Sequence, residues 1–397
     1  MARKISPQIK NQRQKSENGE KKICHKQKCN FPIEKKGMKR GDELRKFDYK
    51  KIMNLSLPVD LYHSMAQIHE FKGKQELYVQ AYPDVVDKMI DVAKIQSTKS
   101  SNAIEGIYTN DTRLNELMKK KSEPRNRNEE EIAGYRHVLD IVHENYGYIE
   151  FKKNDILTLH NQLYSYSYVN YRGRFKTMDN TIMEIDSMRK QKVRFQPVSS
   201  FETERYMEEM FRAYEDAIKI NIPPLLLIPT VIHDFLCIHP FDDGNGRMSR
   251  ILTLLLLYKF GYFVGRYISI EMLIEETKSS YYDELQKSSK NWHEGKNDEL
   301  PFIRYMIGIL LKAYRECDER FRLIGREKLS SSTRVFDMLT KSLLPLSKKD
   351  LMTLCPDLSQ RTVERALKEL QDNGKIKPIG KGRATQYVKI GSIDETF

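Results

Sequence analysis

The feature that most constrains this chain is a dense polar segment held between two strongly apolar ones. The segment HPFDDGNGRMSR occupies residues 239–250, after IPPLLLIPTVIHDFLCI and before ILTLLLLYKF. Apolar runs of this kind predict two buried helices, over about 225–238 and 248–260, joined by the polar segment. Polar groups fixed between buried helices must find partners, so we expect a chemical site at this junction.

The glycines of this segment predict an anion site. Gly244, Asn245 and Gly246 directly precede an apolar helix, where a tight turn leaves backbone N–H groups pointing outward. A helix N-terminus also carries partial positive charge. Arg247 and Arg250 are three residues apart, so they share one face of the first helical turns and suit phosphate oxygens.

Two further side chains add chemistry to the anion site. Asp243 would repel a phosphate unless a cation lay between them, which points to Mg²⁺. His239 can accept a proton near neutral pH. Together these residues predict phosphate-ester chemistry, and the alternative is a capped helix turn with surface arginines.

At these residues the chain resembles Fic-domain proteins. Their signature is His-x-Phe-x-(Asp/Glu)-Gly-Asn-Gly-Arg-x-x-Arg, and residues 239–250 match it at every fixed position. The resemblance implies a mainly α fold: a Fic-type helical core over 126–325 with an inserted β-hairpin flap. It also implies a nucleotidyltransferase that moves AMP from ATP to a Ser, Thr or Tyr hydroxyl of a target protein, whose identity the sequence leaves open.

The resemblance also implies residue roles. His239 takes the proton of the attacking hydroxyl, Asp243 holds Mg²⁺, and Gly244, Asn245 and Gly246 cradle the phosphates. Arg247 holds the β-phosphate end, Arg250 binds the γ-phosphate, and Phe241 anchors the loop. Relatives that phosphorylate carry a changed Gly-Asn-Gly-Arg segment, whereas this chain keeps it, which favours AMP transfer.

Alternating residues over 181–197 predict a β-hairpin, with TIMEI and KVRFQ as its strands. In the family picture such a hairpin is a flap that docks the target's backbone as an added strand. The alternative is an ordinary packed hairpin.

The segment SNAIEG, residues 101–106, predicts an autoinhibitory contact. Ser101 and Glu105 are four residues apart, so a helix places them on one face. Beside a Fic loop the segment, which ends at Gly106, resembles the inhibitory motif (Ser/Thr)-x-x-x-Glu-(Gly/Asn). We expect Glu105 to pair with Arg250 and take the place of the γ-phosphate. In some relatives the same glutamate assists removal of AMP, and the sequence leaves open whether this chain does so.

The last part of the chain, 326–397, predicts a small α+β winged helix-turn-helix domain. Two short helices precede a strand, a turn and a strand. Gln360, Arg361, Arg365 and Lys368 would line the exposed side of the second helix as candidate DNA contacts, with Lys381 and Arg383 on the wing. Two alternatives stay open: a winged helix that binds protein, and a DNA-binding regulator whose Fic domain senses nucleotide.

The first 125 residues predict two further regions. Residues 1–51 hold 17 Lys and Arg against 6 Asp and Glu, which accounts for +11 of the chain's formal charge of +13. This favours a basic, disordered tail over 1–50, which could touch nucleic acid or an acidic partner. Residues 51–125 predict a helical region that carries the inhibitory helix, and KKKSEPRNRNEEE at 119–131 is expected to be a charged linker.

Composition favours a cytoplasmic protein without a membrane partner. Five scattered Cys are typical of a reducing compartment, and no apolar run reaches the length of a membrane span. The N-terminus lacks the apolar region of a secretory signal. Fic-domain proteins often dimerise, so a homodimer is a further expectation.

Overall fold

The computed structural model describes residues 23–24, 45–81, 83–119, 122–185, 191–325, 330–342, 344–380, 382 and 385–390. Most of the basic tail, and the wing residues Lys381 and Arg383, lie outside the described residues. Among the described residues, no helix combines the length and the apolar character needed to cross a bilayer.

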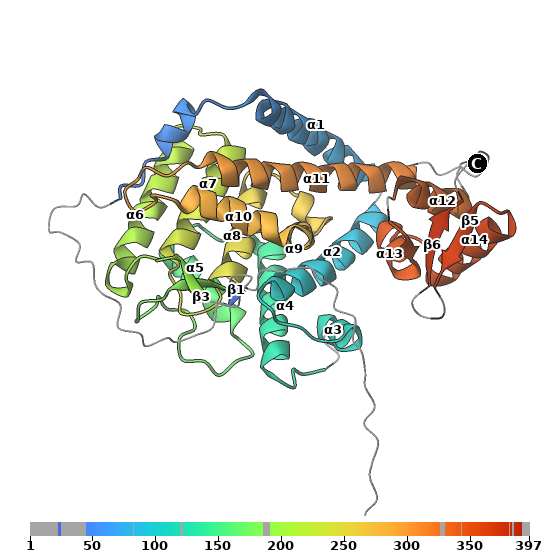
Figure 1. Cartoon of the computed structure of the whole chain (residues 1–397), viewed down its shortest axis with the longest axis horizontal. Coiled ribbons are helices and arrows are strands. Elements are labelled where there is room, and N and C mark those ends of the chain that lie inside the picture. The colour runs from blue at the N-terminus through green and yellow to red at the C-terminus, as the bar shows by residue number, and fades with distance from the viewer. Residues whose placement is uncertain are drawn as a thin grey trace, which may run out of the picture.

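The described chain is mainly helical, as expected, with a small β-hairpin and a small C-terminal sheet (Figure 1). The helices are α1 Val59–Ala81, α2 Pro83–Ile104, α3 Asp111–Met118, α4 Arg127–Asn145, α5 Lys153–Leu163, α6 Ser200–Lys219, α7 Pro224–Ile238, α8 Asn245–Lys259, α9 Ile270–Glu276, α10 Lys278–Ser289, α11 Leu300–Gly325, α12 Ser331–Lys341, α13 Lys348–Leu354 and α14 Gln360–Asp372. The strands are β1 Ile23–Cys24, β2 Ile182–Ile185, β3 Gln191–Phe195, β4 Leu346–Ser347, β5 Ile376–Ile379 and β6 Gln386–Lys389.

The helices α7 and α8 form the centre of the main core. Every residue of α7 from Leu225 to Ile238 is buried, and so is α8 from Met248 to Tyr258. Around this pair pack α4, α6, α10 and α11, while α2 and α9 pack against each other. Burial on all sides explains why α7 and the later turns of α8 are mostly apolar rather than amphipathic.

Helix α4 begins earlier than the sequence suggests. The side chain of Asn126 accepts a hydrogen bond from the Glu129 backbone N–H, which caps the helix before Arg127. The prediction of a linker through residue 131 was therefore wrong at its end, because Glu129, Glu130 and Glu131 belong to the first turns of a helix. Acidic residues there complement the helix dipole.

The hairpin carries a third, short strand. Strands β2 and β3 pair antiparallel, and β1 pairs with the other edge of β2, with Ile23 opposite Glu184 and Cys24 opposite Met183. The hairpin's expected strands are confirmed, whereas nothing in the sequence pattern predicted that residues 23–24 would join them.

The C-terminal unit has its own small core. Its elements follow the order α12, β4, α13, α14, β5, β6, and its sheet has the order β4-β6-β5. Buried residues of α12, α13 and α14 pack with Ile376 and Tyr387 in a cluster separate from the main core. The long helix α11 leads from the main body to this unit (Figure 1).

Candidate active site

The polar segment forms a tight loop from the end of α7 to the start of α8. His239 ends α7 in the left-handed conformation, with φ of 53°, and Gly244 opens α8 with φ of 85°. Asn245 closes the loop, because its side chain accepts from the Phe241 N–H at 2.9 Å and donates to the Phe241 carbonyl at 2.8 Å. Phe241 is fully buried and stacks on His160 with ring centroids 3.8 Å apart. The loop is therefore rigid.

The tautomer of His239 follows from its surroundings. Nδ1 lies 3.2 Å from the Leu236 carbonyl, which can only accept, so Nδ1 carries the proton. Nε2 is then the basic nitrogen of the neutral ring. His239 also lines the cavity described below.

A buried lysine and an asparagine from the preceding segment brace this loop. Lys176 donates from its backbone to the Pro240 carbonyl at 2.8 Å and from Nζ to the Ile238 carbonyl at 3.1 Å. Nζ also donates to Asn180 Oδ1 at 2.9 Å, and Asn180 Nδ2 donates to the carbonyls of His239 and Phe241. Burial lowers the pKa of Lys176 to about 7. These bonds hold the strained backbone on both sides of His239.

Arg250 is held by the end of α2. Its NH2 donates to Glu105 Oε1 at 2.8 Å and to the Ser101 carbonyl at 2.9 Å, while Nε donates to Ser101 Oγ at 2.7 Å. The Arg250 side chain is 4% exposed and that of Glu105 is 13% exposed, so water screens this ion pair weakly. Burial alone would lower the pKa of Arg250, but the charge of Glu105 raises it.

The backbone explains why glycine follows Glu105. Ile107 N–H donates to the Asn102 carbonyl and Gly106 N–H to the Ala103 carbonyl, both at 3.0 Å, and Gly106 has φ of 78°. This is a Schellman cap, in which Glu105 is the C-cap residue just after α2 and Gly106 supplies the left-handed residue. Lys278 Nζ donates to the Ile104 carbonyl at 2.7 Å. The cap fixes the direction of the Glu105 side chain.

Glu105 lies directly over the start of α8. A Cβ at Gly246 would come 2.2 Å from Glu105 Oε1, so the glycine leaves room for the carboxylate. The first turn of a helix has backbone N–H groups without intrahelical acceptors. The carboxylate therefore occupies space at the same anion-binding turn that the sequence predicts for phosphates.

Arg247 is held by a second set of residues, from α4 and from the segment that follows α5. Its NH2 lies 3.0 Å from Glu131 Oε2 and 2.9 Å from the Tyr164 hydroxyl, and the side chain is 1% exposed. Among the described residues, Arg247 NH1 has no hydrogen-bond acceptor although it is buried. A buried guanidinium nitrogen without an acceptor is costly.

Asp243 faces a cation already. Its Oδ2 lies 3.6 Å from the Arg127 guanidinium, and its Oδ1 accepts from the Gly244 N–H at 2.8 Å. The Arg127 side chain is 59% exposed, and its Nε also donates to Glu131 Oε1 at 2.9 Å. One carboxylate beside an anion site fits Mg²⁺, which keeps waters and shares its remaining ligands with phosphates.

A cavity joins these groups to the hairpin and to α10. Its wall contains residues of β2, β3, α7, α8 and α10, together with the residues that follow α2 and α7: Glu105, Ile182, Arg194, Phe195, Leu236, Cys237, His239, Gly246, Arg250, Tyr281, Tyr282, Leu285, Gln286 and Ser289. The predicted residues Glu105, His239, Gly246 and Arg250 thus border one space. Arg194 spans it, since its guanidinium donates to the Tyr282 carbonyl and lies over the Tyr282 ring.

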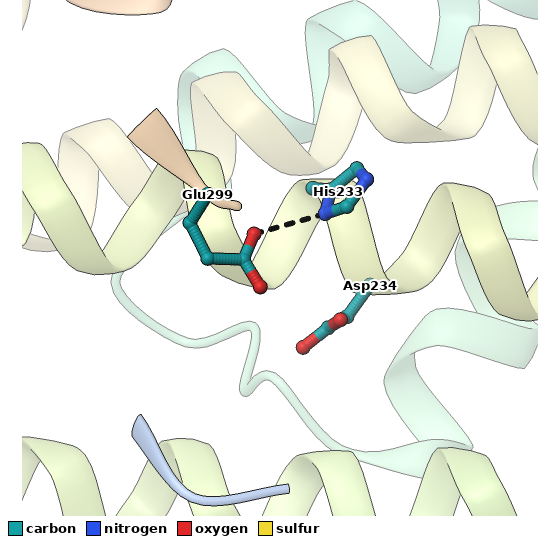
Figure 2. Close-up of side chains that lie close together, drawn as sticks. All are labelled: His233, Asp234 and Glu299. Atoms are coloured by element: carbon teal, nitrogen blue, oxygen red, sulfur yellow. Dashed lines mark hydrogen bonds and ion pairs between the residues drawn. The ribbon is translucent and has the colours of Figure 1, made fainter. Parts of the chain in front are cut away.

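Behind this cavity, His233, Asp234 and Glu299 form a buried cluster whose residue types could hold a metal (Figure 2). Their ligand atoms already have other partners. Asp234 Oδ1 accepts from Arg45 and from Trp292 Nε1, both at 2.7 Å, and Oδ2 accepts from the Tyr49 hydroxyl at 2.9 Å. The Arg45 guanidinium supplies the positive charge, so this cluster fastens residues 45–49 to α7.

Sequence reasoning missed several partners at this site. Glu131, Tyr164, Lys176 and Asn180 touch the loop or its arginines, yet they come from three separate segments with no recognisable motif.

The candidate DNA contacts lie away from this site: Gln360, Arg361, Arg365 and Lys368 are all exposed on α14.

Comparison with known proteins matches the same region. Residues 150–257 match the family profile described as Fic/DOC family. Protein adenylyltransferase fic-1 of Caenorhabditis elegans is 25% identical over 157 residues, which are 40% of this chain and 27% of that protein. A Fido domain-containing protein of Dictyostelium discoideum is 26% identical over 119 residues, which are 30% of this chain and 78% of that protein. The chain thus spans about a quarter of the C. elegans relative.

Solved structures show the same fold. A Fic family protein from Desulfovibrio desulfuricans superposes with a TM-score of 0.55 at 20% identity, covering 85% of this chain and 98% of that one. A Fic domain containing signaling protein from Bacteroides thetaiotaomicron gives a TM-score of 0.54 at 20% identity, covering 64% and 97%. The matched segment includes the loop at 239–250. Residues 150–257 thus match the Fic/DOC family, and the chain has the mainly helical fold of the solved Fic structures.

Proposed function

We propose that this protein is an adenylyltransferase that moves AMP from ATP to a hydroxyl of a target protein and restrains itself through Glu105. The observation that carries the proposal is that His239, Gly246, Arg250 and Glu105 border one cavity. A base, an anion-binding helix start and an arginine then face the same substrate. The C. elegans relative, which is a protein adenylyltransferase, supports the reaction class.

The chemistry assigned to the chain is a substitution at the α-phosphorus of ATP. His239 Nε2 takes the proton of the incoming hydroxyl while the new O–P bond forms, and the bond to pyrophosphate breaks. The Leu236 carbonyl keeps the proton on Nδ1 and so keeps Nε2 basic. Lys176 and Asn180 hold His239 in place, which limits the reorganisation that the step requires.

The phosphates have two candidate sets of partners at the start of α8. The first-turn N–H groups at Gly246 supply one, and the unmatched NH1 of Arg247 supplies another. Asp243 is the residue that would hold Mg²⁺, whose charge offsets that of the phosphates. The apolar and aromatic wall at Phe195, Leu236 and Leu285 suits the base of a nucleotide.

In this proposal, Glu105 inhibits AMP transfer. Its carboxylate accepts a hydrogen bond from the Arg250 guanidinium and lies next to Gly246 in the anion-binding turn. A triphosphate would compete for both groups, and two negative charges cannot share them without repulsion. Nucleotide binding in a productive position therefore requires Glu105 to leave.

The edge of β2 could receive a target's backbone as an added strand, as the flap role requires, but another segment of the chain occupies that edge. In the structure this edge already pairs with Ile23–Cys24, so a target strand that docks there must replace that pairing. The target then competes with the chain's own residues.

The test measures which phosphorus atom of ATP becomes covalently attached to protein. A Glu105→Gly variant is incubated with Mg²⁺ and ATP labelled at either the α- or the γ-phosphorus. The proposal predicts covalent label on protein from the α position alone. Label from the γ position would indicate phosphoryl transfer, and label from neither would favour a nucleotide-sensing regulator.

A second role for the C-terminal unit rests on a different observation. Arg361, Arg365 and Lys368 share an exposed face of α14, which is the second helix after β4. We propose that this face contacts the DNA backbone. Fluorescence anisotropy with duplex DNA at rising salt tests this, and an affinity unchanged by Arg361→Ala with Arg365→Ala contradicts it.

A further inference from the structure

Cys237 is placed between a buried histidine and the cavity. It lies on α7 one turn after His233 and two residues before His239, and it lines the cavity wall. Its Sγ is 3.4 Å from His233 Nε2 and 3.6 Å from Ser289 Oγ. Cys237 therefore differs from an ordinary core cysteine, because its sulfur contacts the titratable His233 while the residue lines the candidate active site.

The hydrogen bonds of His233 indicate that both ring nitrogens carry protons. Nδ1 lies 3.0 Å from Glu299 Oε2, a carboxylate that can only accept (Figure 2). Nε2 lies 3.2 Å from Ser289 Oγ, whose own proton goes to the Leu285 carbonyl at 2.7 Å. Ser289 is left as an acceptor, so His233 donates on this side too.

The electrostatics agree with an imidazolium at His233. Burial disfavours the charged ring, yet Cys237 and Glu299 raise the pKa of His233 well above its usual range. The same pairing lowers the pKa of Glu299, against the opposite effect of burial. A cation beside Sγ stabilises the negative charge that develops on sulfur when it attacks an electrophile.

Two other cysteines provide an internal contrast. Cys317 and Cys355 are each 1% exposed, and burial raises their pKa values to about 12 and about 11. Cys237 has a comparable exposure of 2%, but only Cys237 of these three lies in the cavity wall beside a histidine. Burial alone therefore does not decide their relative reactivity.

We propose that Cys237 is a peroxide-sensitive thiol in the wall of the active-site cavity. Sulfur attacks one oxygen of hydrogen peroxide, the S–O bond forms and the O–O bond breaks. Sulfur is oxidised to the sulfenic acid, and the departing oxygen takes up a proton and leaves as water. The water-sized space in the cavity is about 50 Å³, which is several times what one water needs, so a peroxide molecule fits.

Oxidation at this position has a predicted consequence for the cavity. The added oxygen stands among Ser289, Leu285 and Leu236, which line the same wall as Cys237. Resting on the proposed function, we infer that the oxidised chain binds nucleotide more weakly. This consequence is separate from the reactivity itself and is measured separately.

The reactivity is tested on the full chain with dilute hydrogen peroxide. Catalase ends the reaction, a cyclic 1,3-diketone traps sulfenic acids under denaturing conditions, and peptide mass spectrometry quantifies each cysteine. The proposal predicts that Cys237 is oxidised at least about tenfold faster than Cys317 and Cys355 in the same sample. Equal rates at the three positions overturn it.

Two variants test the role of the cluster. His233→Asn removes the cation, and Glu299→Gln removes its carboxylate partner if the first variant does not fold. Either should slow oxidation of Cys237 about tenfold, with Cys317 as the unchanged control. A rate at Cys237 that the folded variants leave unchanged overturns the proposal.

The consequence is tested by nucleotide binding before and after peroxide. The wild-type chain should lose affinity, whereas Cys237→Ser should keep it, and equal loss in both overturns the inferred consequence. A chain that binds no nucleotide even before peroxide contradicts the proposed function instead, and the oxidation rates still decide the reactivity of Cys237.

Discussion

Arg250 NH2 lies 2.8 Å from Glu105 Oε1, although 145 residues separate them in the chain. The ion pair ties the end of α2 to the second turn of α8, at the helix whose start forms the candidate anion site. A carboxylate in this position competes with a triphosphate, so the geometry couples the position of one side chain to the access of substrate.

Glu105→Gly should increase self-labelling from ATP by at least about tenfold, because removal of the carboxylate frees Arg250 and the first turn of α8. Intact-mass measurement of the AMP adduct over time checks this. Ser101→Ala is the graded control, since it removes a bond to Arg250 Nε but leaves the ion pair. It should raise labelling less than Glu105→Gly, and a larger increase would contradict the role given to Glu105.

Tyr164→Phe should weaken ATP binding about tenfold in the Glu105→Gly background. The hydroxyl holds Arg247 NH2 at 2.9 Å, and a hydrogen bond to a charged group contributes roughly 1.5 kcal/mol or more. Titration of ATP by calorimetry measures the change. Tyr168→Phe is the matched control, because Tyr168 is exposed. If the two variants bind alike, Tyr164 does not position Arg247 for phosphate.

Stability should rise with pH above neutrality because of Lys176. Burial lowers its folded pKa to about 7, while the unfolded side chain keeps its usual value of about 10.4. Between these values the unfolded state binds the extra proton, so the free energy of unfolding increases with pH. Below about pH 7 both states are protonated and this contribution is constant.

The measurement is the difference in unfolding free energy between the wild type and Lys176→Met at several pH values. Relative to that variant, the wild type should gain about 2 kcal/mol between pH 7 and pH 9. The variant removes the titrating group and keeps an unbranched apolar side chain, so other groups cancel. A difference that stays flat over this range would show that Lys176 remains charged in the folded chain.

The double substitution Ile23→Pro, Cys24→Pro should increase modification of added target proteins by roughly fivefold. Proline has no backbone N–H to donate to β2, and each hydrogen bond between the strands contributes about 1 kcal/mol, so the pairing of β1 with β2 is weakened. Label transfer to a lysate by the Glu105→Gly chain, with and without these changes, gives the comparison. Ile23→Val keeps the N–H group and should have no effect. Equal transfer by all forms would mean that the β2 edge does not receive targets.

The sequence predicted the parts of this site that lie within one motif. The contiguous loop at 239–250, and the pattern from Ser101 to Gly106, carry their spacing in the chain itself, and a hairpin shows as alternation over 181–197. The two central helices followed from the apolar runs on either side of the loop, and the mainly helical fold from the resemblance to Fic-domain proteins.

The partners that act across the fold could not be predicted in this way. Glu131 belongs to a run of charges that is typical of a solvated segment, and only the packing of α4 on α8 brings it to Arg247. Lys176 and Asn180 precede the hairpin without any periodic pattern, and their role depends on the loop they support. Contacts of this kind depend on tertiary packing, which one sequence does not display.

The most direct test compares Glu105→Gly with the Glu105→Gly, His239→Ala double variant. Both are first shown to bind ATP with Mg²⁺ with equal affinity, and AMP transfer is then followed with α-labelled ATP. The account predicts that loss of the base slows transfer by about a hundredfold or more without a change in nucleotide affinity. Transfer at the same rate in the two variants would contradict the assignment of His239 and, with it, the proposed mechanism.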